Sequence, residues 1–308
     1  MEKLKILFYG SGVLGSLYAV RLKEIGHDVT VLARRKRLTE IIVLEDTSTG
    51  RRTTTKVNTI EQLDPQDRYD LIVILVRGNQ VASVLPVLAA NKITPNLLFM
   101  SNNAGGYKEL IDVVGRERVL LGFPGAGGTK EGHVIRYNII SKYVQKTTIG
   151  EIDGSMTNRI KRICLEFEKA GFHAEISSNI DAWLKTHVAL VSPIANAIYM
   201  AGGDNYKLSH NREALLLNVR AIREGFHVLE SLGIPVTPNR LKSLKLIPKS
   251  ILVSIMSRVY NTKWSQLVMT QHSNAARDEM KQLADDFLTL ARKSSVPTPA
   301  INKLYTYI

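Results

Sequence analysis

The fold of this chain is decided by one six-residue stretch, Gly10-Ser11-Gly12-Val13-Leu14-Gly15. It follows the apolar run at residues 4–9 and precedes an apolar-periodic segment that ends near Ile25, which predicts a buried strand, a glycine turn and a helix. In a G-x-G-x-x-G turn the first glycine permits the bend, the second lets a pyrophosphate approach the backbone, and the third allows close helix–strand packing. The helix N-terminus then offers N–H groups to the phosphates. We expect these six residues to bind a dinucleotide; a merely tight strand–helix turn is the alternative.

Further short apolar runs extend this pattern along the first half of the chain. Segments suited to buried strands stand at residues 29–32, 71–76, 97–100 and 119–122, with helical patterns between several of them. Strands that alternate with helices predict a parallel sheet joined by right-handed crossovers. We therefore expect an α/β Rossmann-type dinucleotide-binding domain.

The pattern changes after about residue 155. A helix over Thr157–Ala170 and a short strand over His173–Ile176 are followed by segments with almost purely helical periodicity. Helices are expected over residues 180–200, 211–232, 238–259 and 274–293. The predicted organisation is thus a cofactor-binding domain at residues 1–178, followed by an all-α C-terminal domain at residues 179–308 that binds substrate and carries out catalysis.

Composition restricts the class of protein. Hydrophobic residues make up 44% and charged residues 22% of the 308, as in soluble globular proteins, which excludes a disordered or collagen-like chain. Cys164 is the only cysteine, so an intramolecular disulfide is excluded and no metal site is expected. The first residues lack the layout of a signal peptide, and the uncharged stretch Thr186–Gly203 contains enough polar residues to indicate a buried helix. We expect a cytoplasmic protein without a membrane partner.

The net charge of +13 is the unusual feature of the composition. It would suit nucleic acid, an anionic membrane or small anionic ligands, and it is spread over both halves of the chain. No helix-turn-helix, zinc or aromatic-platform motif is present, so a nucleic-acid partner is not expected. Residues 239–263 hold six cations and no acid among apolar residues. They form either a solvated basic face of amphipathic helices or a wall that attracts an anionic substrate.

The end of the second expected strand bears on the choice of dinucleotide. There the sequence reads Leu32-Ala-Arg34-Arg-Lys-Arg37, without the acid that would bind a ribose 2′-hydroxyl in NAD. The guanidinium of Arg34 could instead hold a 2′-phosphate through two hydrogen bonds. We therefore expect NADP as the cofactor, with a solvated basic loop as the alternative.

Five further motifs stand in order along the chain. They are Arg77-Gly-Asn-Gln80, Ser101-Asn102-Asn103, the loop and strand Gly122–Ile135, Trp183-Leu-Lys185, and Asp278-Glu279-Met280 with a tail that includes Pro297-Thr-Pro299 and Leu304-Tyr305. With the glycine turn and Arg34, they make the chain resemble the ketopantoate reductase (2-dehydropantoate 2-reductase) family over most of its length.

The resemblance implies cofactor contacts at four positions. Arg77, where the family has a lysine, and Gln80 would contact the dinucleotide. Gly128 lies in the loop that borders the nicotinamide in the family. Asn102 would hold the nicotinamide ribose or the bound ketone through its amide; a turn-forming asparagine after a strand is the alternative.

The resemblance also implies a catalytic pair, Lys185 at the family's catalytic lysine and Glu279 at its active-site glutamate. Three positions depart from the family pattern. Ala189 and Pro193 stand where the family has asparagines that help to bind the keto acid, and Asn103 replaces a glycine. These departures bear on the identity of the substrate rather than on reductase chemistry.

The residues themselves support an acid on the helix over 180–200. Reduction of a carbonyl leaves an alkoxide that needs a proton, which Lys185 could supply. Lys185, Ala189, Ser192 and Asn196 share one helix face by their spacing, and this narrow polar stripe predicts a wet cleft. Ser192 and Asn196 would then bind substrate in place of the missing asparagines. A surface lysine at a helix start is the alternative for Lys185.

One glutamate and two histidines are further candidates for the site. Glu279 borders the apolar stripe of its helix and would bind a substrate hydroxyl or orient Lys185; a solvated surface glutamate is the alternative. His187 and His272 lack acidic neighbours at zinc-site spacing, and a lone helical histidine is more often packed or hydrogen-bonded than catalytic. His272 could line the same cleft as Glu279 if the helix extends that far.

The sequence thus predicts NADPH-dependent reduction of a small anionic 2-keto acid to a 2-hydroxy acid, with 2-dehydropantoate as the expected substrate and the site in a cleft between the two halves. One alternative is a reductase of another keto or imino acid, as in opine-forming dehydrogenases. The other is a non-enzymatic NADP-binding sensor. The sequence is compatible with a homodimer and does not determine the oligomeric state.

Overall fold

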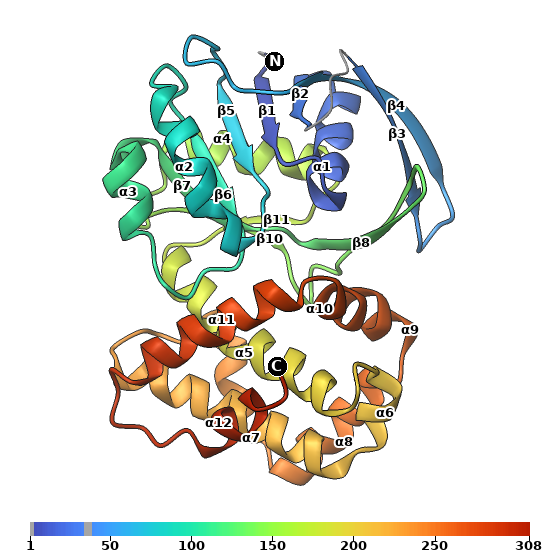
Figure 1. Cartoon of the computed structure of the whole chain (residues 1–308), viewed down its shortest axis with the longest axis vertical. Coiled ribbons are helices and arrows are strands. Elements are labelled where there is room, and N and C mark those ends of the chain that lie inside the picture. Colours follow the sequence, from blue (N-terminus) through green and yellow to red (C-terminus); the bar gives the residue numbers. More distant parts are fainter. Residues whose placement is uncertain (1–2, 34–38) are drawn as a thin grey trace. The chain divides into compact units, whose positions relative to one another are not determined.

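The computed structural model describes residues 3–33 and 39–308, which form two compact units (Figure 1). The first unit comprises residues 1–101 and 107–180, and the second comprises residues 102–106 and 181–308. The first is a sheet with flanking helices and the second is helical, so the expected fold class is confirmed. The short segment 102–106 belongs to the helical unit although it follows a strand of the sheet, which no pattern in the sequence indicates.

Within the described residues the sheet of the first unit has eleven strands: β1 (Lys5–Tyr9), β2 (Asp28–Leu32), β3 (Thr39–Asp46), β4 (Arg52–Ile60), β5 (Leu71–Ile74), β6 (Leu97–Met100), β7 (Val119–Phe123), β8 (Ala126–Glu131), β9 (Val134–Ile139), β10 (Thr147–Glu151) and β11 (Ala174–Ile176). Their order is β11-β10-β7-β6-β5-β1-β2-β4-β3-β9-β8. The helical segments of this unit are α1 (Val13–Glu24), η1 (Gly78–Gln80), α2 (Val81–Ala90), α3 (Lys108–Val114), η2 (Arg116–Arg118) and α4 (Asn158–Lys169).

The sheet is mixed, which corrects the expectation of a purely parallel one. Its centre, β7-β6-β5-β1-β2, is parallel as predicted. Antiparallel pairs join β3 to β4, β8 to β9, and β7 to β10. The strand β4 was missed because its sequence, Arg-Thr-Thr-Thr-Lys-Val-Asn-Thr-Ile, is polar at seven of its nine positions, and its residues are alternately exposed from Arg52 to Asn58. A strand with one solvated face has no continuous apolar run to reveal it.

The core of the first unit lies against α1 and α4. Tyr18 of α1 stacks on Phe172 with the ring centroids 3.8 Å apart, and its hydroxyl lies 2.6 Å from Oγ1 of Thr147 on β10. Loss of hydration on burial raises the pKa of the Tyr18 hydroxyl well above its usual range, although the hydrogen bond with Thr147 acts in the opposite direction. The aromatic cluster holds α1, and with it the glycine turn, in place on the sheet.

The second unit consists of helices packed around α5. Its elements are α5 (Ile180–Met200), α6 (Asn205–His210), α7 (Arg212–Ser231), η3 (Asn239–Lys245), α8 (Lys249–Tyr260), α9 (Lys263–Ser265), η4 (Gln266–Thr270), α10 (Gln271–Ala275), α11 (Arg277–Ala291) and α12 (Pro299–Tyr305). The central part of α5 is buried, as the sequence predicts for an apolar helix. No helix within the described ranges is both long and apolar enough to span a membrane.

Two predicted helices have different bounds in the structure. The segment 238–259 is not one helix: the 3₁₀ helix η3 ends at Lys245, and α8 begins after Pro248, which has no N–H to continue the earlier ladder. The helix expected over 274–293 begins at Arg277, because Ala276 has φ −129° and ψ 40°, outside the helical region. The boundary at Ala276 places Glu279 in the first turn of α11.

Candidate active site

The glycine turn joins β1 to α1, and packing requires two of its glycines. Gly10 has φ of +124°, and a Cβ atom there would lie 2.7 Å from the carbonyl oxygen of Leu75. A Cβ atom at Gly15 would collide with the carbonyl oxygen of Gly10. At Gly12, by contrast, no atom of the described chain lies within 4 Å of the position that a Cβ would take. Gly12 therefore leaves an open approach to the backbone.

The N-terminus of α1 has the properties of a phosphate site. Gly12 is its N-cap, no described side chain caps the first turn, and that turn contains no acid. Ser11, Val13 and Leu14 surround the cap. Their N–H groups and the helix dipole create a positive potential that a pyrophosphate could occupy. The turn thus fits the dinucleotide expected from the sequence.

Arg77 and Gln80 follow β5 in a short turn. The N–H of Arg77 donates to Oε1 of Gln80 at 3.4 Å, and the N–H of Gln80 donates to the carbonyl of Arg77 at 2.9 Å. The Gln80 amide therefore shapes this turn, while the side chain of Arg77 is exposed. Arg34, the predicted reader of a 2′-phosphate, lies outside the described residues.

Gly128 lies on β8 beside the glycine turn. A Cβ atom at this position would lie 3.0 Å from Cα of Tyr137 on β9 and 3.1 Å from Cγ1 of Val13 on α1. Close packing therefore requires glycine here independently of any ligand. The expected contact of Gly128 with the cofactor stays a prediction.

Lys185 lies in the first half of α5 and forms an ion pair with Asp181 one turn earlier. The two side chains are only 13% and 25% exposed, respectively. The carboxylate restricts the rotamers of the lysine and holds its Nζ on one side of the helix. Sequence reasoning missed Asp181, although an Asp–Lys pair four residues apart on a helix is a recognisable signal.

Asn102 and Glu279 form a second pair within the helical unit, and this pair is buried. They are 8% and 4% exposed, and Nδ2 of Asn102 donates to Oε1 of Glu279 at 3.5 Å. Oδ1 of Asn102 is buried and has no hydrogen-bond partner among the described residues. A buried acceptor without a partner is costly, and a donor group on a ligand would satisfy it. Glu279 is thus not the solvated surface residue that was its alternative.

The loop 102–106 connects these two pairs. The amide of Asn103 donates to the carbonyl of Gly106 at 2.8 Å and accepts the N–H of Gly106 at 2.9 Å, so the loop closes on itself. A Cβ atom at Gly106 would lie 3.9 Å from Nζ of Lys185. One end of the loop therefore contacts Glu279 and the other end lies beside Lys185. The three residues with predicted catalytic roles belong to one compact unit.

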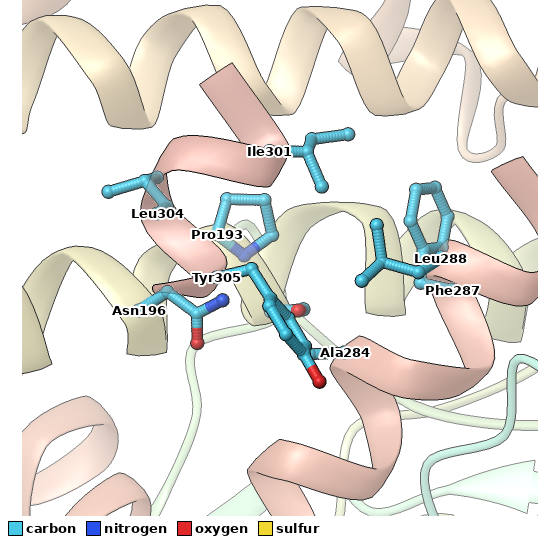
Figure 2. A pocket seen from close by; sticks show the side chains of 9 residues that line it. Pro193, Asn196, Ala284, Phe287, Leu288, Ile301, Leu304 and Tyr305 are labelled. Atoms are coloured by element: carbon cyan, nitrogen blue, oxygen red, sulfur yellow. The ribbon is translucent and has the colours of Figure 1, made fainter. Parts of the chain in front are cut away.

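The remaining members of the polar stripe on α5 are buried, which corrects the expectation of a wet cleft along its length. Ser192 and Asn196 are 6% and 3% exposed and line a pocket with residues of α11 and α12 (Figure 2). Ala189 is fully buried against Gly225 of α7. The apolar faces of α7 and α11 cover the stripe because this part of α5 is the core of the unit. The roles of Ser192 and Asn196 in substrate binding stay predictions.

His187 packs one turn along α5 from Trp183. The two rings are stacked with centroids 5.2 Å apart and planes 9° from parallel. Loss of hydration, with the nearby charge of His272 on α10 as a second cause, lowers the pKa of His187 to about 3. His187 is therefore neutral near pH 7, as suits a packed histidine. No group of three or more His, Cys, Asp or Glu residues within the described chain could hold a metal ion.

These features define a class of protein: a dinucleotide-dependent oxidoreductase, in which a Rossmann-type unit with a glycine turn accompanies a helical unit that carries a partly buried Lys–Asp pair and a buried Asn–Glu pair. The family model described as Ketopantoate reductase PanE/ApbA matches residues 6–154. The first half of the chain is thus similar to the ketopantoate reductase family.

Similar proteins extend the match to nearly the whole chain. The 2-dehydropantoate 2-reductase of Aquifex aeolicus is 22% identical, and the alignment covers 96% of this chain and 93% of that protein. The structure of 2-dehydropantoate 2-reductase from Geobacter metallireducens has a TM-score of 0.79 at 14% identity and covers 99% and 98% of the two chains. A D-mandelate dehydrogenase with NADH and anilino(oxo)acetate has a TM-score of 0.74 at 15% identity, covering 99% and 96%. At these identities the structures establish the fold alone.

Proposed function

We propose that the protein reduces a 2-keto acid to a 2-hydroxy acid with NADPH, and that 2-dehydropantoate, reduced to pantoate, is the first substrate to test. The observation that carries the proposal is the loop 102–106, which joins the Asn102–Glu279 pair to the Lys185–Asp181 pair within one unit of a chain that is similar to ketopantoate reductases. An acid, an amide and a carboxylate at one place are the groups that carbonyl reduction needs.

The chain's own residues suit a dinucleotide. The open backbone at Gly12 and the uncapped first turn of α1 would hold the pyrophosphate, Arg77 and Gln80 would contact the cofactor, and Gly128 would border it. When bound, the nicotinamide supplies the hydride that reduces the carbonyl carbon.

The helical unit would supply the proton and the orientation. Lys185 holds an ammonium proton at Nζ and donates it to the carbonyl oxygen as negative charge develops there. Asp181 positions that ammonium from one turn away. Glu279 would accept a hydrogen bond from a substrate hydroxyl, and the unpartnered Oδ1 of Asn102 would accept one from the ligand.

The choice of NADPH rests on Arg34 and the cations that follow it in the sequence. Arg34→Ala should weaken NADPH binding at least tenfold and leave NADH binding within about twofold, because only NADPH carries the 2′-phosphate. Fluorescence titration of both dinucleotides measures this, with Arg51→Ala, which removes an exposed cation in the β3–β4 turn, as the matched control. Equal losses for both dinucleotides would contradict the assignment.

The choice of keto acid is open to a direct test. Ala189 is buried against Gly225, where a Cβ atom would lie 3.2 Å from Cβ of Ala189, so this position offers no polar group to a substrate. NADPH absorbance should be followed with 2-dehydropantoate, pyruvate, 2-ketoisovalerate and phenylglyoxylate, each with and without an added amino acid. Turnover that requires the amino acid would favour the opine-type alternative. NADPH binding without turnover of any member would favour a sensor. The cytoplasmic location and a homodimer stay predictions.

A further inference from the structure

The outward side of α8 is apolar, which is unusual for a helix at the surface. Leu252 and Tyr260 are buried on its inward side, where the helix packs against α6 and α7 (Figure 1). On the opposite side Ile251, Ile255 and Val259 follow one another at four-residue spacing and are 49%, 46% and 37% exposed. A surface helix normally presents polar side chains to water, so packing within the chain does not explain this stripe.

Leu246 extends the stripe beyond the helix. It lies between η3 and α8 and is 85% exposed, which is the largest exposed fraction among the large apolar side chains that the structure describes. Single exposed apolar residues are common, but several that lie close together in one segment indicate a contact surface. We call this surface the α8 face, and its apolar members are Leu246, Ile251, Ile255 and Val259.

The charges around the α8 face are mostly of one sign. Residues 239–263 contain six cations and no acid. Four of these cations are exposed: Lys242, Lys249, Arg258 and Lys263. Of the three acids on the neighbouring helix α7, Glu230 pairs with Lys245 and Glu224 accepts N–H groups of α12, which leaves Glu213 in the first turn. The face therefore combines exposed aliphatic side chains with an excess of positive charge.

This combination fits the surface of an anionic membrane better than it fits other occupants. Aliphatic side chains gain free energy on entering the boundary between headgroups and acyl chains, and neighbouring cations attract anionic headgroups. Nucleic acid would satisfy the cations through its phosphates but leave the aliphatic side chains without an apolar partner. A second copy of the chain, docked through the same face, would bring like charges together.

We propose that the α8 face is a peripheral membrane-binding surface that docks on anionic phospholipid. Leu246 and the stripe on α8 enter the interfacial layer, and Lys249 and Arg258 contact the lipid phosphates. Docking of this kind requires no spanning helix, and none occurs within the described ranges. The inference goes beyond the proposed reaction and does not depend on it. It replaces the expectation, drawn from the sequence, that the protein has no membrane partner.

Sedimentation with lipid vesicles tests the proposal on the full chain, without dinucleotide or keto acid. Vesicles of equal parts phosphatidylglycerol and phosphatidylcholine should bind the protein in about 0.1 M salt, and vesicles of phosphatidylcholine alone should bind it at least tenfold more weakly. Because no turnover is measured, failure here and failure of the proposed reductase activity are distinguishable. Equal binding to the two compositions, or binding to neither, would overturn the proposal.

Paired charge variants separate the α8 face from a general attraction by the net charge. Lys249→Gln/Arg258→Gln should weaken vesicle binding at least tenfold, since each basic residue near an anionic surface contributes about fivefold. Lys92→Gln/Lys161→Gln removes the same charge from exposed positions of the first unit. This matched control should bind within about twofold of the parent. Equal weakening by the two pairs would refute the α8 face as the site of docking.

The apolar contribution has a test of its own. Leu246→Ser should weaken vesicle binding by about threefold or more, because it removes the most exposed aliphatic side chain of the face. Leu165→Ser, at a leucine of α4 that is 51% exposed, is the control and should bind like the parent. Velocity sedimentation and titration with duplex DNA address the other occupants. A dimer that Leu246→Ser dissociates, or tighter binding to DNA than to the anionic vesicles, would overturn the proposal.

Discussion

Lys185 is the residue on which the proposed chemistry most depends. Its ion pair with Asp181 and its position beside Gly106 fix where its ammonium group lies within the helical unit. We expect Lys185→Ala to reduce kcat by about 10²-fold or more, which is the usual contribution of a general acid, and to leave NADPH affinity unchanged. Stopped-flow turnover and fluorescence titration measure the two quantities.

The chain offers a matched control for this variant. Lys281 forms an equivalent Lys–Asp pair with Asp285 one turn along α11, but it is exposed. Lys281→Ala removes the same charge from the same unit and should leave kcat within about twofold. Turnover by Lys185→Ala within threefold of the parent would remove Lys185 from the mechanism.

His187 should make the protein less stable in mild acid. Its pKa of about 3 in the folded state is below the 6.5 of an unperturbed histidine, so below pH 6.5 the unfolded chain takes up a proton that the folded chain does not. Stability therefore falls as pH decreases from 6.5, by up to about 1.4 kcal/mol per pH unit. His187→Phe, which keeps a ring against Trp183, should flatten the unfolding free energy between pH 6.5 and 5.

Urea unfolding at each pH measures the difference between the two proteins. His133→Gln, a change at an exposed histidine, should keep the slope of the parent. If the parent and His187→Phe lose stability equally over this range, His187 is not the group that titrates on unfolding.

At the scale of elements, two glycines of the glycine turn have different roles: Gly12 is expected to serve ligand binding, and Gly15 is required by packing. Gly12 has an ordinary φ of −71° and open space at its Cβ position, so Gly12→Ala should lower stability by less than about 1 kcal/mol. It should nevertheless weaken NADPH binding at least tenfold, because the added methyl occupies the approach of the pyrophosphate. Thermal unfolding and fluorescence titration measure the two effects.

Gly15→Ala is the contrasting change in the same turn. Its methyl would collide with the carbonyl of Gly10, so we expect a loss of about 1–3 kcal/mol of stability or more. Should Gly12→Ala unfold the protein like Gly15→Ala, or bind NADPH like the parent, Gly12 would have only a structural role.

Elements with a strong local signal were predicted well, and the others were not. The parallel centre of the sheet, α1, α5 and α7 have long apolar runs or periodic apolar faces that burial requires. The strands β4 and β8 were missed because one has a polar, exposed face and the other, Ala126–Glu131, begins with small residues. Their strand structure comes from antiparallel pairing with the neighbouring strands β3 and β9, and a search for apolar runs does not detect such pairing.

At the scale of the whole molecule, the chain contributes one loop of its first half to its helical unit. Ala104 is 2% exposed within the helical core, whereas its neighbour Gly105 is exposed. Ala104→Asp should destabilise that unit by several kcal/mol, because a carboxylate would be buried without a partner. Hydrogen exchange should then rise in peptides from residues 181–308 and stay unchanged in peptides from residues 107–180.

Gly105→Asp adds the same charge one residue away on an exposed position, and it should leave exchange unchanged throughout. Faster exchange in residues 107–180 of the Ala104→Asp protein would mean that the loop supports the first unit instead.

By itself the sequence determined the class of fold, the position of the glycine turn and the residues to examine, because glycine requirements, apolar periodicity and motif order are local properties of the chain. Only the tertiary structure decided that Glu279 is buried beside Asn102, that Asp181 and Gly106 lie next to Lys185, and that Ser192 and Asn196 are buried against α11 and α12. Contacts between residues up to 177 positions apart, such as Asn102 and Glu279, depend on how helices pack, and helical spacing predicts which residues share a face but not what covers that face.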